Sequence, residues 1–354
     1  MRYRVYVPTT LLSREAEERF VAAEDVELVF ALPEDERTYS SARAAERSVR
    51  VAEALAEALP TIDALCAVGV NKQLVVDAKL LARARRLRVI FVPGSGTDTI
   101  DLDAATARGI AVVNAPGANA PAVAEHTLGL MLALTRKIAV ADRTAHIRRA
   151  LASSDLSGLP ELLRDKTLLV VGMGFIGREV TRICQALGVT VAAIDPRLDP
   201  VEAEQLRVHQ VIRLADGLAS ADVVSLHAPL TPATRHLIGW EELVSMRRSA
   251  LLINTARGGL VDTEAMVNAL QTDEIAGAGL DVTDPEPLPE GHPLFACGSV
   301  VLTPHAAGSS ARVRTRASVI AAEGALQALH GERPSNLVNS QVWDRFCARF
   351  RSVG

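Results

Sequence analysis

Short apolar runs alternate with amphipathic stretches along almost the whole chain. Apolar runs bounded by turn residues predict strands, and stretches with helical periodicity predict helices. In the first third we expect strands at 3–8, 26–30, 64–68, 88–92 and 110–113, with helices at 13–23, 42–58, 71–84 and 102–108. This β-α alternation predicts an α/β fold with an open parallel sheet.

A second α/β unit is predicted to begin at residue 167, after a long helix over 122–150 that is rich in Ala, Leu and Gly. Such a composition indicates close packing, either as a domain spine or against another subunit. The stretch 151–164 is less regular and is interpreted as a surface excursion. Further strands are expected at 222–226, 250–254, 277–281 and 300–302, followed by a helix at 310–330. That helix can return to the first sheet, which would make the domains discontinuous.

The most informative motif is Gly172-Met173-Gly174-Phe175-Ile176-Gly177, between a predicted buried strand (168–171) and a predicted helix (175–187). The first glycine permits a tight turn, the second lets backbone approach a pyrophosphate, and the third lets the helix pack closely on the strand. The helix N-terminus offers N–H groups to that anion. Asp195 ends the next strand, where its carboxylate can accept hydrogen bonds from a ribose. Together these features predict a dinucleotide site.

Composition restricts the classes of function. The 354 residues suggest two domains, and the net charge of −4 gives no indication of a nucleic-acid surface. The four cysteines include no C-x-x-C pair, which predicts free thiols in a reducing cytoplasm and no metal site. The longest apolar stretch, around 128–134, is too short to span a bilayer, and no signal peptide is visible. We therefore expect a soluble cytoplasmic protein.

Three chemically useful side chains follow predicted strands: Arg257, Glu286 and His305. In open α/β sheets, ligands bind outside the carboxyl ends of the strands, where the glycine loop also lies. A guanidinium can clamp a carboxylate, and an imidazole held by a carboxylate can donate a proton to a carbonyl oxygen. Taken singly, each residue has an ordinary explanation as a structural donor, a solvated acid or a surface ion pair. Their shared position favours a hydride-transfer site.

The chain resembles the D-isomer-specific 2-hydroxyacid dehydrogenases from about residue 88 to residue 339. The motifs that carry the resemblance occur in the family's order. They are Gly94-Ser95-Gly96-Thr97-Asp98, Asn114-Ala115-Pro116-Gly117, Ala124-Glu125-His126-Thr127, the glycine loop, His227-Ala228-Pro229-Leu230-Thr231, the run from Asn254 to Gly258, the run from Leu280 to Pro287, and Thr303-Pro304-His305-Ala306-Ala307-Gly308.

This resemblance implies roles for individual residues. Arg257, Glu286 and His305 would be catalytic, and Ser95 and Gly96 would bind the substrate together with Arg257 and His305. NAD would be bound by Gly172, Gly174, Phe175, Ile176, Gly177, Asp195, His227, Ala228, Pro229, Thr231, Thr255, Ala256, Asp281, His305 and Gly308. Within that set, His227 would line the cofactor cleft through its backbone, and Asp281 would hold the nicotinamide carboxamide. His126 would instead pack inside the long helix.

The resemblance also implies an architecture of two doubly wound parallel-sheet domains. Residues 1–113 and 307–354 would form a discontinuous flavodoxin-like substrate domain, and residues 114–306 an inserted Rossmann NAD-binding domain. Family members are mostly homodimers built on the helix that corresponds to 122–150. The partners expected are therefore a small 2-keto or 2-hydroxy acid and a second copy of the chain, with no nucleic acid and no membrane.

The chain departs from the family pattern after the long helix, where the usual Gly-x-Trp segment is absent and Arg148 and Arg149 occur. These cations either read a second anionic group on the substrate, such as phosphate or phosphonate, or form a solvated helix end. The lysine of phosphite dehydrogenases has no match in 92–98, and Glu286 argues against formate as the substrate. Asp195 would repel the 2′-phosphate of NADP, while Arg197 leaves some use of NADP open.

These observations predict an NAD-dependent 2-ketoacid reductase that forms the D-2-hydroxy acid, with His305 as the proton donor. The alternative is a catalytically silent NAD-sensing protein of the same fold, because such proteins can retain the Arg, Glu and His set. The sequence does not identify the acid.

Overall fold

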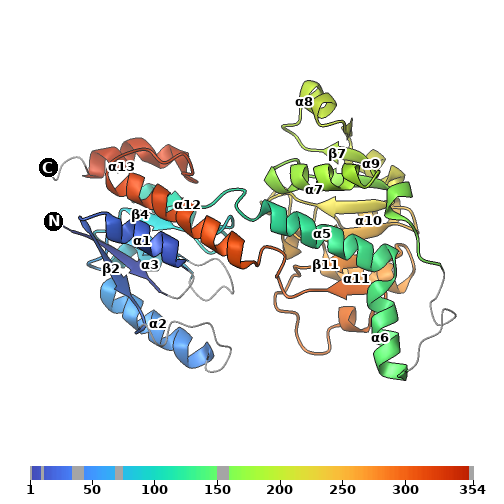
Figure 1. Cartoon of the computed structure of the whole chain (residues 1–354), viewed down its shortest axis with the longest axis horizontal. Helices are drawn as coiled ribbons and strands as arrows, with labels where there is room; N and C mark the ends of the chain where they lie inside the picture. The colour runs from blue at the N-terminus through green and yellow to red at the C-terminus, as the bar shows by residue number, and fades with distance from the viewer. Residues whose placement is uncertain (1, 9–11, 34–43, 68–74, 150–158, 351–354) are drawn as a thin grey trace. The chain divides into compact units, whose positions relative to one another are not determined.

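The computed structural model describes residues 2–8, 12–33, 44–67, 75–149 and 159–350. The chain divides into two compact units, which are described separately (Figure 1). Unit 1 comprises Met1–Asn119 and Ser309–Gly354, and unit 2 comprises Ala120–Gly308. The domain boundaries expected from the sequence fall after residues 113 and 306.

Unit 1 is built on a five-stranded parallel sheet of order β2-β1-β3-β4-β5. Its strands are β1 (Tyr3–Val7), β2 (Val26–Phe30), β3 (Ala64–Cys66), β4 (Val89–Phe91) and β5 (Ala111–Val113). Its helices are α1 (Arg14–Ala22), α2 (Ala44–Ala58), α3 (Ala78–Arg83), α4 (Leu102–Ala107), α12 (Ala311–Leu329), α13 (Trp343–Phe350) and the 3₁₀ turn η6 (Ser340–Val342).

Both faces of this sheet are covered, because successive strand residues point to opposite sides. On β1, Val5 and Val7 join a core formed with α1, α12 and α13, while Tyr6 joins the core formed with α2, α3 and α4. The C-terminal segment is tied in by buried Asn339, whose Oδ1 accepts a hydrogen bond from the Val112 amide at 2.9 Å. The last long helix, α12, packs against β4 and β5 of the first sheet.

One predicted helix of unit 1 begins later than expected. The helix predicted over 71–84 starts at Ala78, because Asp77 caps it by accepting a hydrogen bond from the Leu80 amide at 2.7 Å. The residue before the cap, Val76, instead forms a parallel bridge to Ile100. Residues 71–74, and the first two residues of the helix predicted over 42–58, lie outside the described residues.

Unit 2 is built on a seven-stranded parallel sheet of order β12-β11-β10-β9-β6-β7-β8. Its strands are β6 (Thr167–Val171), β7 (Thr190–Ile194), β8 (His209–Gln210), β9 (Val223–Leu226), β10 (Leu251–Asn254), β11 (Gly277–Leu280) and β12 (Val300–Leu302). Its helices are α5 (Ala120–Thr135), α6 (Ile138–Arg148), α7 (Phe175–Ala186), α8 (Pro200–Gln205), α9 (Leu214–Ser220), α10 (Trp240–Ser245) and α11 (Thr263–Gln271), with 3₁₀ turns η3 (Leu163–Asp165), η4 (Gly258–Leu260) and η5 (Pro293–Ala296).

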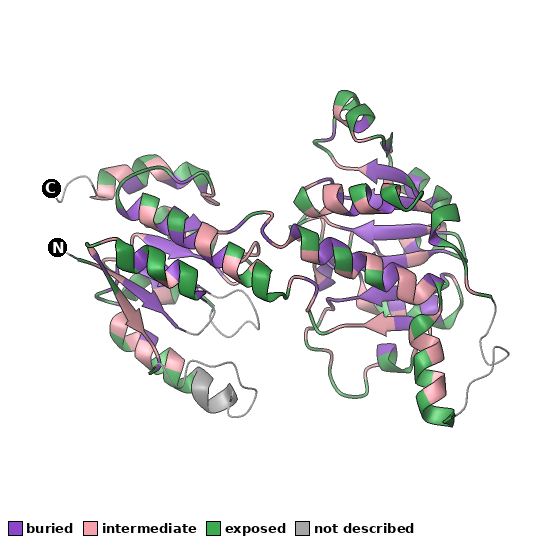
Figure 2. Cartoon of the chain, viewed as in Figure 1, coloured by how far each residue is buried: buried purple, intermediate pink, exposed green. Residues whose placement is uncertain are grey.

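The central strands of unit 2, β6, β9, β10 and β11, are largely buried on both faces, as Figure 2 shows. Along β6, Leu168 and Val170 enter the core shared with α5 and α7, while Leu169 and Val171 enter the core shared with α9, α10 and α11. Both sheets are therefore covered by helices on both sides. This confirms the predicted α/β class with two doubly wound parallel sheets.

The long helix predicted over 122–150 is wrong as a single element. It is divided into α5 and α6 at Lys137, which has the left-handed φ of +56°. Upstream of this point, α5 packs against β10, β11, β12 and α7, whereas α6 has no buried residue. No glycine or proline occurs at 136–137 to signal the break. The helix therefore ends where packing on the sheet ends. Residue 150 and most of the predicted excursion at 151–164 lie outside the described residues.

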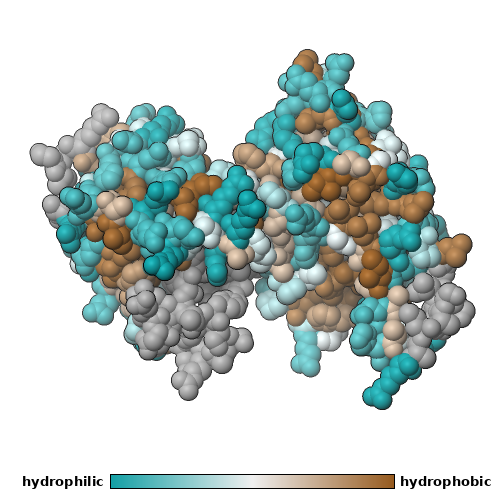
Figure 3. Space-filling view, in the orientation of Figure 1, coloured by the Kyte–Doolittle hydropathy of each residue, from teal (hydrophilic) through white to brown (hydrophobic). Residues whose placement is uncertain are grey.

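Hydrophobic side chains gather over α5 on the face of unit 2 that Figure 3 shows. Beyond α5, the side chains of Ile138 and Ile147 on α6 are 56 % and 82 % exposed. No helix within the described residues combines the length and the apolar character needed to cross a membrane.

Candidate functional site

The candidate residues of unit 2 follow the carboxyl ends of neighbouring strands. Because the sheet is wholly parallel, these ends lie along one edge. Along that edge, His305 follows β12, Glu286 follows β11, Arg257 follows β10, His227 follows β9, the glycine loop follows β6 and Asp195 follows β7. The distance from β12 to β7 covers five strand spacings, about 24 Å. The edge can therefore accommodate an elongated ligand.

The glycine loop lies at the topological switch point of unit 2, between β6 and β9. Gly172 has a φ of +99°, and a Cβ there would lie 2.7 Å from the His227 carbonyl oxygen. A Cβ on Gly177 would lie 2.0 Å from the Gly172 carbonyl oxygen. Only glycine fits at these two positions, where strand, loop and helix approach closely. Phe175 and Ile176 form the first turn of α7, and the Phe175 side chain points to solvent with 64 % exposure.

Asp195 follows β7, and its side chain connects the end of this strand to the glycine loop by a hydrogen bond. Its Oδ2 accepts a hydrogen bond from the Met173 amide at 2.8 Å, and its Oδ1 accepts one from the Arg197 amide at 2.8 Å. Each carboxylate oxygen can accept more than one hydrogen bond, and the Asp195 side chain is 10 % exposed. The Arg197 side chain is 86 % exposed, with its Nε 3.9 Å from Oδ1.

His227 lies beside the glycine loop and is held by its backbone and one ring nitrogen. Its amide donates to the Val171 carbonyl oxygen at 2.8 Å, and its Nε2 lies 2.8 Å from the Ser225 hydroxyl. The other ring nitrogen, Nδ1, is buried and has no partner among the described residues. Burial disfavours the charged imidazolium and lowers the pKa of His227 to about 3. The imidazole is therefore neutral at physiological pH.

The segment after His227 is a compact turn closed by a threonine. Thr234 Oγ1 donates to the Pro229 carbonyl oxygen at 2.6 Å and accepts a hydrogen bond from the Thr231 amide at 2.8 Å. Ala228 and Pro229 thus lead from β9 into a fixed turn. Thr231 is held by Thr234, a residue that gave no signal in the sequence.

Arg257 lies in a turn that Asn254 shapes from the last position of β10. Asn254 is buried, its Oδ1 accepts from the Ala256 amide at 3.0 Å, and its Nδ2 donates to the Arg257 carbonyl oxygen at 2.8 Å. The Arg257 guanidinium is half-buried, and its Nη1 donates to the Ala256 carbonyl oxygen at 2.7 Å. One amide side chain therefore fixes the turn that presents the guanidinium.

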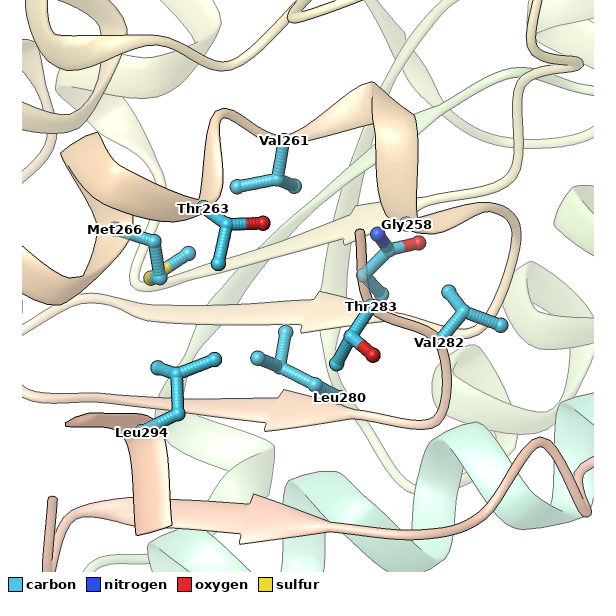
Figure 4. Close-up of a pocket in the computed structure, with 9 residues that line it drawn as sticks. Gly258, Val261, Thr263, Met266, Leu280, Val282, Thr283 and Leu294 are labelled. Carbon is cyan, nitrogen blue, oxygen red and sulfur yellow. The ribbon is translucent and has the colours of Figure 1, made fainter. Parts of the chain in front are cut away.

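The Arg257 turn rests on packed apolar side chains. Figure 4 shows Val261, Met266, Leu280 and Leu294 around a cavity of about 10 Å³, next to Gly258. This space is about that of one water molecule, so the turn has a nearly filled apolar support. At about 10 Å³ the cavity is too small to hold a dinucleotide or a keto acid, so it is not the ligand site.

Glu286 and His305 are in direct contact. His305 Nδ1 lies 2.7 Å from Glu286 Oε1, and the two side chains are 42 % and 30 % exposed. The loop that carries Glu286 is held by Thr263, whose hydroxyl donates to the Asp284 carbonyl oxygen at 2.6 Å. The pair is therefore preformed and accessible from solvent.

Asp281 holds the turn that presents His305. Its carboxylate accepts hydrogen bonds from the Ala306 amide at 2.8 Å, the Ala307 amide at 2.9 Å and the Thr303 hydroxyl at 2.6 Å. His305 has a left-handed φ of +53°, a conformation that persists in non-glycine residues when the surroundings hold it. The cofactor contact predicted for Asp281 stays a prediction, and the structure adds this positioning contact. Gly308 is the last residue of unit 2.

His126 does not pack inside its helix, and that interpretation is wrong. Its Nε2 lies 2.9 Å from Thr303 Oγ1 and 3.6 Å from Asp281 Oδ1, so the ring reaches the end of the sheet. The next residue, Thr127, is buried and pairs with Thr255, with 2.9 Å between the two hydroxyl oxygens. Sequence reasoning missed the roles of Thr127, Asn254, Thr263 and Thr303. Only Asn254, a polar residue that ends an apolar strand, gave a local signal.

Ser95 and Gly96 lie in unit 1, after β4. The Ser95 hydroxyl is 3.2 Å from the Ala115 carbonyl oxygen and 3.0 Å from Asn119 Oδ1, and Asn114 Nδ2 donates to the Ser95 carbonyl oxygen at 2.7 Å. The loop is therefore fastened to the segment after β5. Arg148 ends α6, and Arg149 follows it with a left-handed φ of +52°. In the described part of the chain, no three His, Cys, Asp or Glu residues are grouped to hold a metal ion.

Comparison with known proteins identifies the family. The family model described as "D-isomer specific 2-hydroxyacid dehydrogenase, NAD binding domain" matches residues 128–307, about half of the chain. The chain belongs to the D-isomer specific 2-hydroxyacid dehydrogenase family. Unit 2 contains the NAD-binding domain that defines this family model.

The family includes relatives with different names. The chain is 41 % identical over 289 residues to a D-3-phosphoglycerate dehydrogenase of Mycobacterium leprae, covering 80 % of this chain and 52 % of that protein. It is 41 % identical over 273 residues to a glyoxylate reductase of Aeropyrum pernix, covering 75 % and 81 %. The chain thus spans about half the length of the phosphoglycerate dehydrogenases that it matches.

A solved structure of the family with NAD is similar to this chain over most of its length. It is the NAD-complexed D-isomer specific 2-hydroxyacid dehydrogenase of Lactobacillus delbrueckii, at a TM-score of 0.72 and 28 % identity, covering 96 % of this chain and 100 % of that chain. The residues of unit 2 fit the same cofactor. The space beside Gly174, at the N-terminus of α7, holds no protein atom within 4 Å of a Cβ placed there, and the buried Nδ1 of His227 nearby has no partner in the described chain.

The buried imidazole of His227 predicts a pH dependence of stability. The unfolded chain takes up a proton near the ordinary histidine pKa of about 6.5, and the folded protein only near pH 3. Between these values the unfolded state binds more protons, so the free energy of unfolding falls as the pH is lowered, by up to about 1.4 kcal/mol per pH unit. Urea unfolding from about pH 7 to about pH 4.5 measures this slope.

A His227→Asn variant should lose that contribution and show a shallower decline. The matched control is His209→Asn, because His209 is exposed on β8. If the free energy of unfolding falls equally steeply with pH in the wild type and in His227→Asn, the assignment of a neutral buried imidazole is contradicted.

Proposed function

We propose that the protein is an NAD-dependent oxidoreductase that interconverts a 2-keto acid and the corresponding D-2-hydroxy acid. The observation that carries the proposal is the preformed His305–Glu286 pair, with 2.7 Å between Nδ1 and Oε1. The pair shares its sheet edge with Arg257 and with the glycine loop. A base held by a carboxylate, a guanidinium and a dinucleotide loop together are what reduction of a charged carbonyl compound requires.

Arg257 would bind the substrate carboxylate and polarise the neighbouring carbonyl. A guanidinium offers several N–H donors in a planar fork that matches a carboxylate. In the structure, Nη1 of Arg257 donates to the adjacent Ala256 carbonyl oxygen, which orients the guanidinium at the end of β10. The same charge would stabilise the oxygen as it becomes an alkoxide, so the interaction strengthens toward the transition state.

His305 would donate the proton that the carbonyl oxygen gains. Because Nδ1 faces Glu286, the opposite nitrogen, Nε2, is the one available to the substrate. The carboxylate orients the ring and stabilises the imidazolium from which the proton leaves. When bound, NADH supplies the hydride that the carbonyl carbon receives. Proton and hydride together convert the keto acid to the hydroxy acid, and the reverse direction returns both.

The remaining predicted contacts are part of the same proposal. Unit 1 would be the substrate-binding domain, with backbone N–H groups of Ser95 and Gly96 directed to the carboxylate. In unit 2, the loop from Gly172 to Gly177, Asp195, the segment from His227 to Thr231, Thr255, Ala256, Asp281 and Gly308 would hold the cofactor. Support comes from the position of these unit 2 residues on one sheet edge.

The first test is a screen for NADH oxidation across 2-keto acids that differ in tail charge and size, with His305→Ala as the diagnostic variant. We expect turnover in the wild type and a loss of roughly 10²–10⁴ in rate in the variant, the usual contribution of a general acid–base group. His236→Ala is a matched control, because His236 also has a φ of +53°, is 45 % exposed and lies 3.8 Å from a carboxylate oxygen, on Asp262. Its rate should equal that of the wild type.

Near-normal activity in His305→Ala would contradict the catalytic assignment. If no acid is turned over while NADH still binds, the result favours the NAD-sensing alternative. The panel includes phosphorylated and plain acids, because Arg148 and Arg149 are proposed to read a second anionic group. A preference for the phosphorylated acid that survives Arg148→Ala/Arg149→Ala would remove that part of the proposal.

Asp195 is expected to select NADH over NADPH. Both of its oxygens accept backbone hydrogen bonds, which fixes the position of the carboxylate at the end of β7, where it would repel a 2′-phosphate. Asp195→Ala should therefore narrow the difference in kcat/KM between the two cofactors. The control is Arg197→Ala, which should lower any residual use of NADPH. A wild-type preference for NADPH would refute the assignment.

We propose that two copies associate through α5 and α6, as the sequence analysis expects. The support is that α6 has no buried residue in the single chain, while short helices need tertiary contacts to be stable in water. Ile147→Asp should convert dimers to monomers in sedimentation equilibrium, because a charge would enter an apolar interface. Val201→Asp on α8 is the control, since Val201 is also exposed, by 64 %. A monomeric wild type would contradict the proposal.

A further inference from the structure

Two consecutive residues of α5, His126 and Thr127, each contact a different loop at the sheet edge. Most of α5 is small and apolar, and it packs on β10, β11 and β12. His126 contacts Thr303, two residues before His305, and Thr127 contacts Thr255, two residues before Arg257. One rigid helix therefore touches the loop of the proposed proton donor and the loop of the proposed carboxylate clamp.

The proton of each hydroxyl can be assigned by counting donors. The Thr303 hydroxyl has one proton and donates it to Asp281 Oδ1 at 2.6 Å. The contact between His126 Nε2 and Thr303 Oγ1, at 2.9 Å, must then be an N–H donation from His126. By the same count, the Thr127 hydroxyl donates to the Val123 carbonyl oxygen at 2.8 Å, so Thr255 donates to Thr127.

The hydrogen bonds from His126 to Thr303 and from Thr303 to Asp281 connect α5 to the carboxylate that holds the His305 turn. Asp281 accepts from the Ala306 and Ala307 amides, and its carbonyl oxygen accepts from the His305 amide at 2.8 Å. These contacts maintain the left-handed φ of His305. Removing the Nε2–H donor would free the Thr303 hydroxyl and the Asp281 carboxylate to change rotamer, because both are held by this network.

We propose that His126 and Thr127 are positioning residues that fix the His305 and Arg257 loops relative to each other from one helix. His126 acts on the His305 loop through Thr303 and Asp281, and Thr127 acts on the Arg257 loop through Thr255. Neither is a catalytic residue. The catalytic consequence rests on the proposed function, whereas the ordering of the two loops does not.

The test combines amide hydrogen exchange with steady-state kinetics in the full chain. His126→Ala should speed exchange of the 305–307 amides by about 10-fold and leave the Ala256 amide unchanged, because only the first loop loses its support. Thr127→Val should instead speed exchange of the Ala256 amide and leave the 305–307 amides unchanged. With a 2-keto acid, His126→Ala should lower kcat about 10-fold, and Thr127→Val should raise KM by a similar factor, because the two loops carry the proton donor and the clamp.

Conservative variants and a matched control separate positioning from general destabilisation. His126→Gln keeps an N–H donor, and Thr127→Ser keeps a hydroxyl. Both variants should therefore show the wild-type amide exchange rates and the wild-type kinetic constants. Thr135→Val on the same helix removes a buried hydroxyl whose described bond, to the Met131 carbonyl oxygen at 2.8 Å, stays within α5. It should leave both loops and both kinetic constants unchanged.

Equal acceleration of exchange in both loops by either variant, or no acceleration at all, would overturn the proposal. A wild type that turns over no 2-keto acid would instead refute the proposed function, while the exchange pattern would still decide whether the two residues position the loops. A third outcome is that each variant speeds amide exchange only in its own loop while kcat and KM stay unchanged. That result would show that α5 orders the loops, but it would overturn the claim that this order affects catalysis.

Discussion

The parallel direction of the seven strands in unit 2 is the constraint on which the candidate site depends. Because every strand runs the same way, the loops after β12, β11, β10, β9, β6 and β7 meet at one edge in a fixed order. The hydrogen-bonded register sets the spacing between neighbouring loops. Side chains separated by more than a hundred residues are thereby placed in line, with the proposed reacting groups at one end and Asp195 at the other.

Buried polar groups then give these loops their shape. An unpaired polar group in the core would destabilise the fold, so each loop is defined by the partners that its buried groups find. The Asn254 side chain forms hydrogen bonds to backbone groups of the turn that carries Arg257. The Asp281 carboxylate accepts hydrogen bonds from backbone amides of the turn that carries His305. The His227 Nδ1, by contrast, is buried without a partner in the described chain. It lies beside the glycine loop, where the backbone of Gly172 approaches the His227 carbonyl group closely.

Prediction from the sequence succeeded where the signal is local. The glycine spacing after an apolar strand correctly predicts the turn from β6 into α7, because strand, turn and helix in such a unit are close in sequence. It failed at Lys137 and at the start of α3. The break at Lys137 reflects the end of packing against the sheet, and α3 starts late because Val76 pairs with Ile100. Neither long-range contact leaves a trace in the local pattern.

The sequence by itself determined the α/β class and the glycine loop, and it selected Asp195, Arg257, Glu286 and His305 as candidate residues. These follow from periodicity and from residue types whose chemistry does not depend on neighbours far along the chain. Only the tertiary structure decided that His305 meets Glu286, that Asp281 holds the His305 turn, and that His126 and Thr127 reach two separate loops. Such contacts depend on helix α5 lying across β10, β11 and β12, and a packing geometry of that kind is set by the whole core.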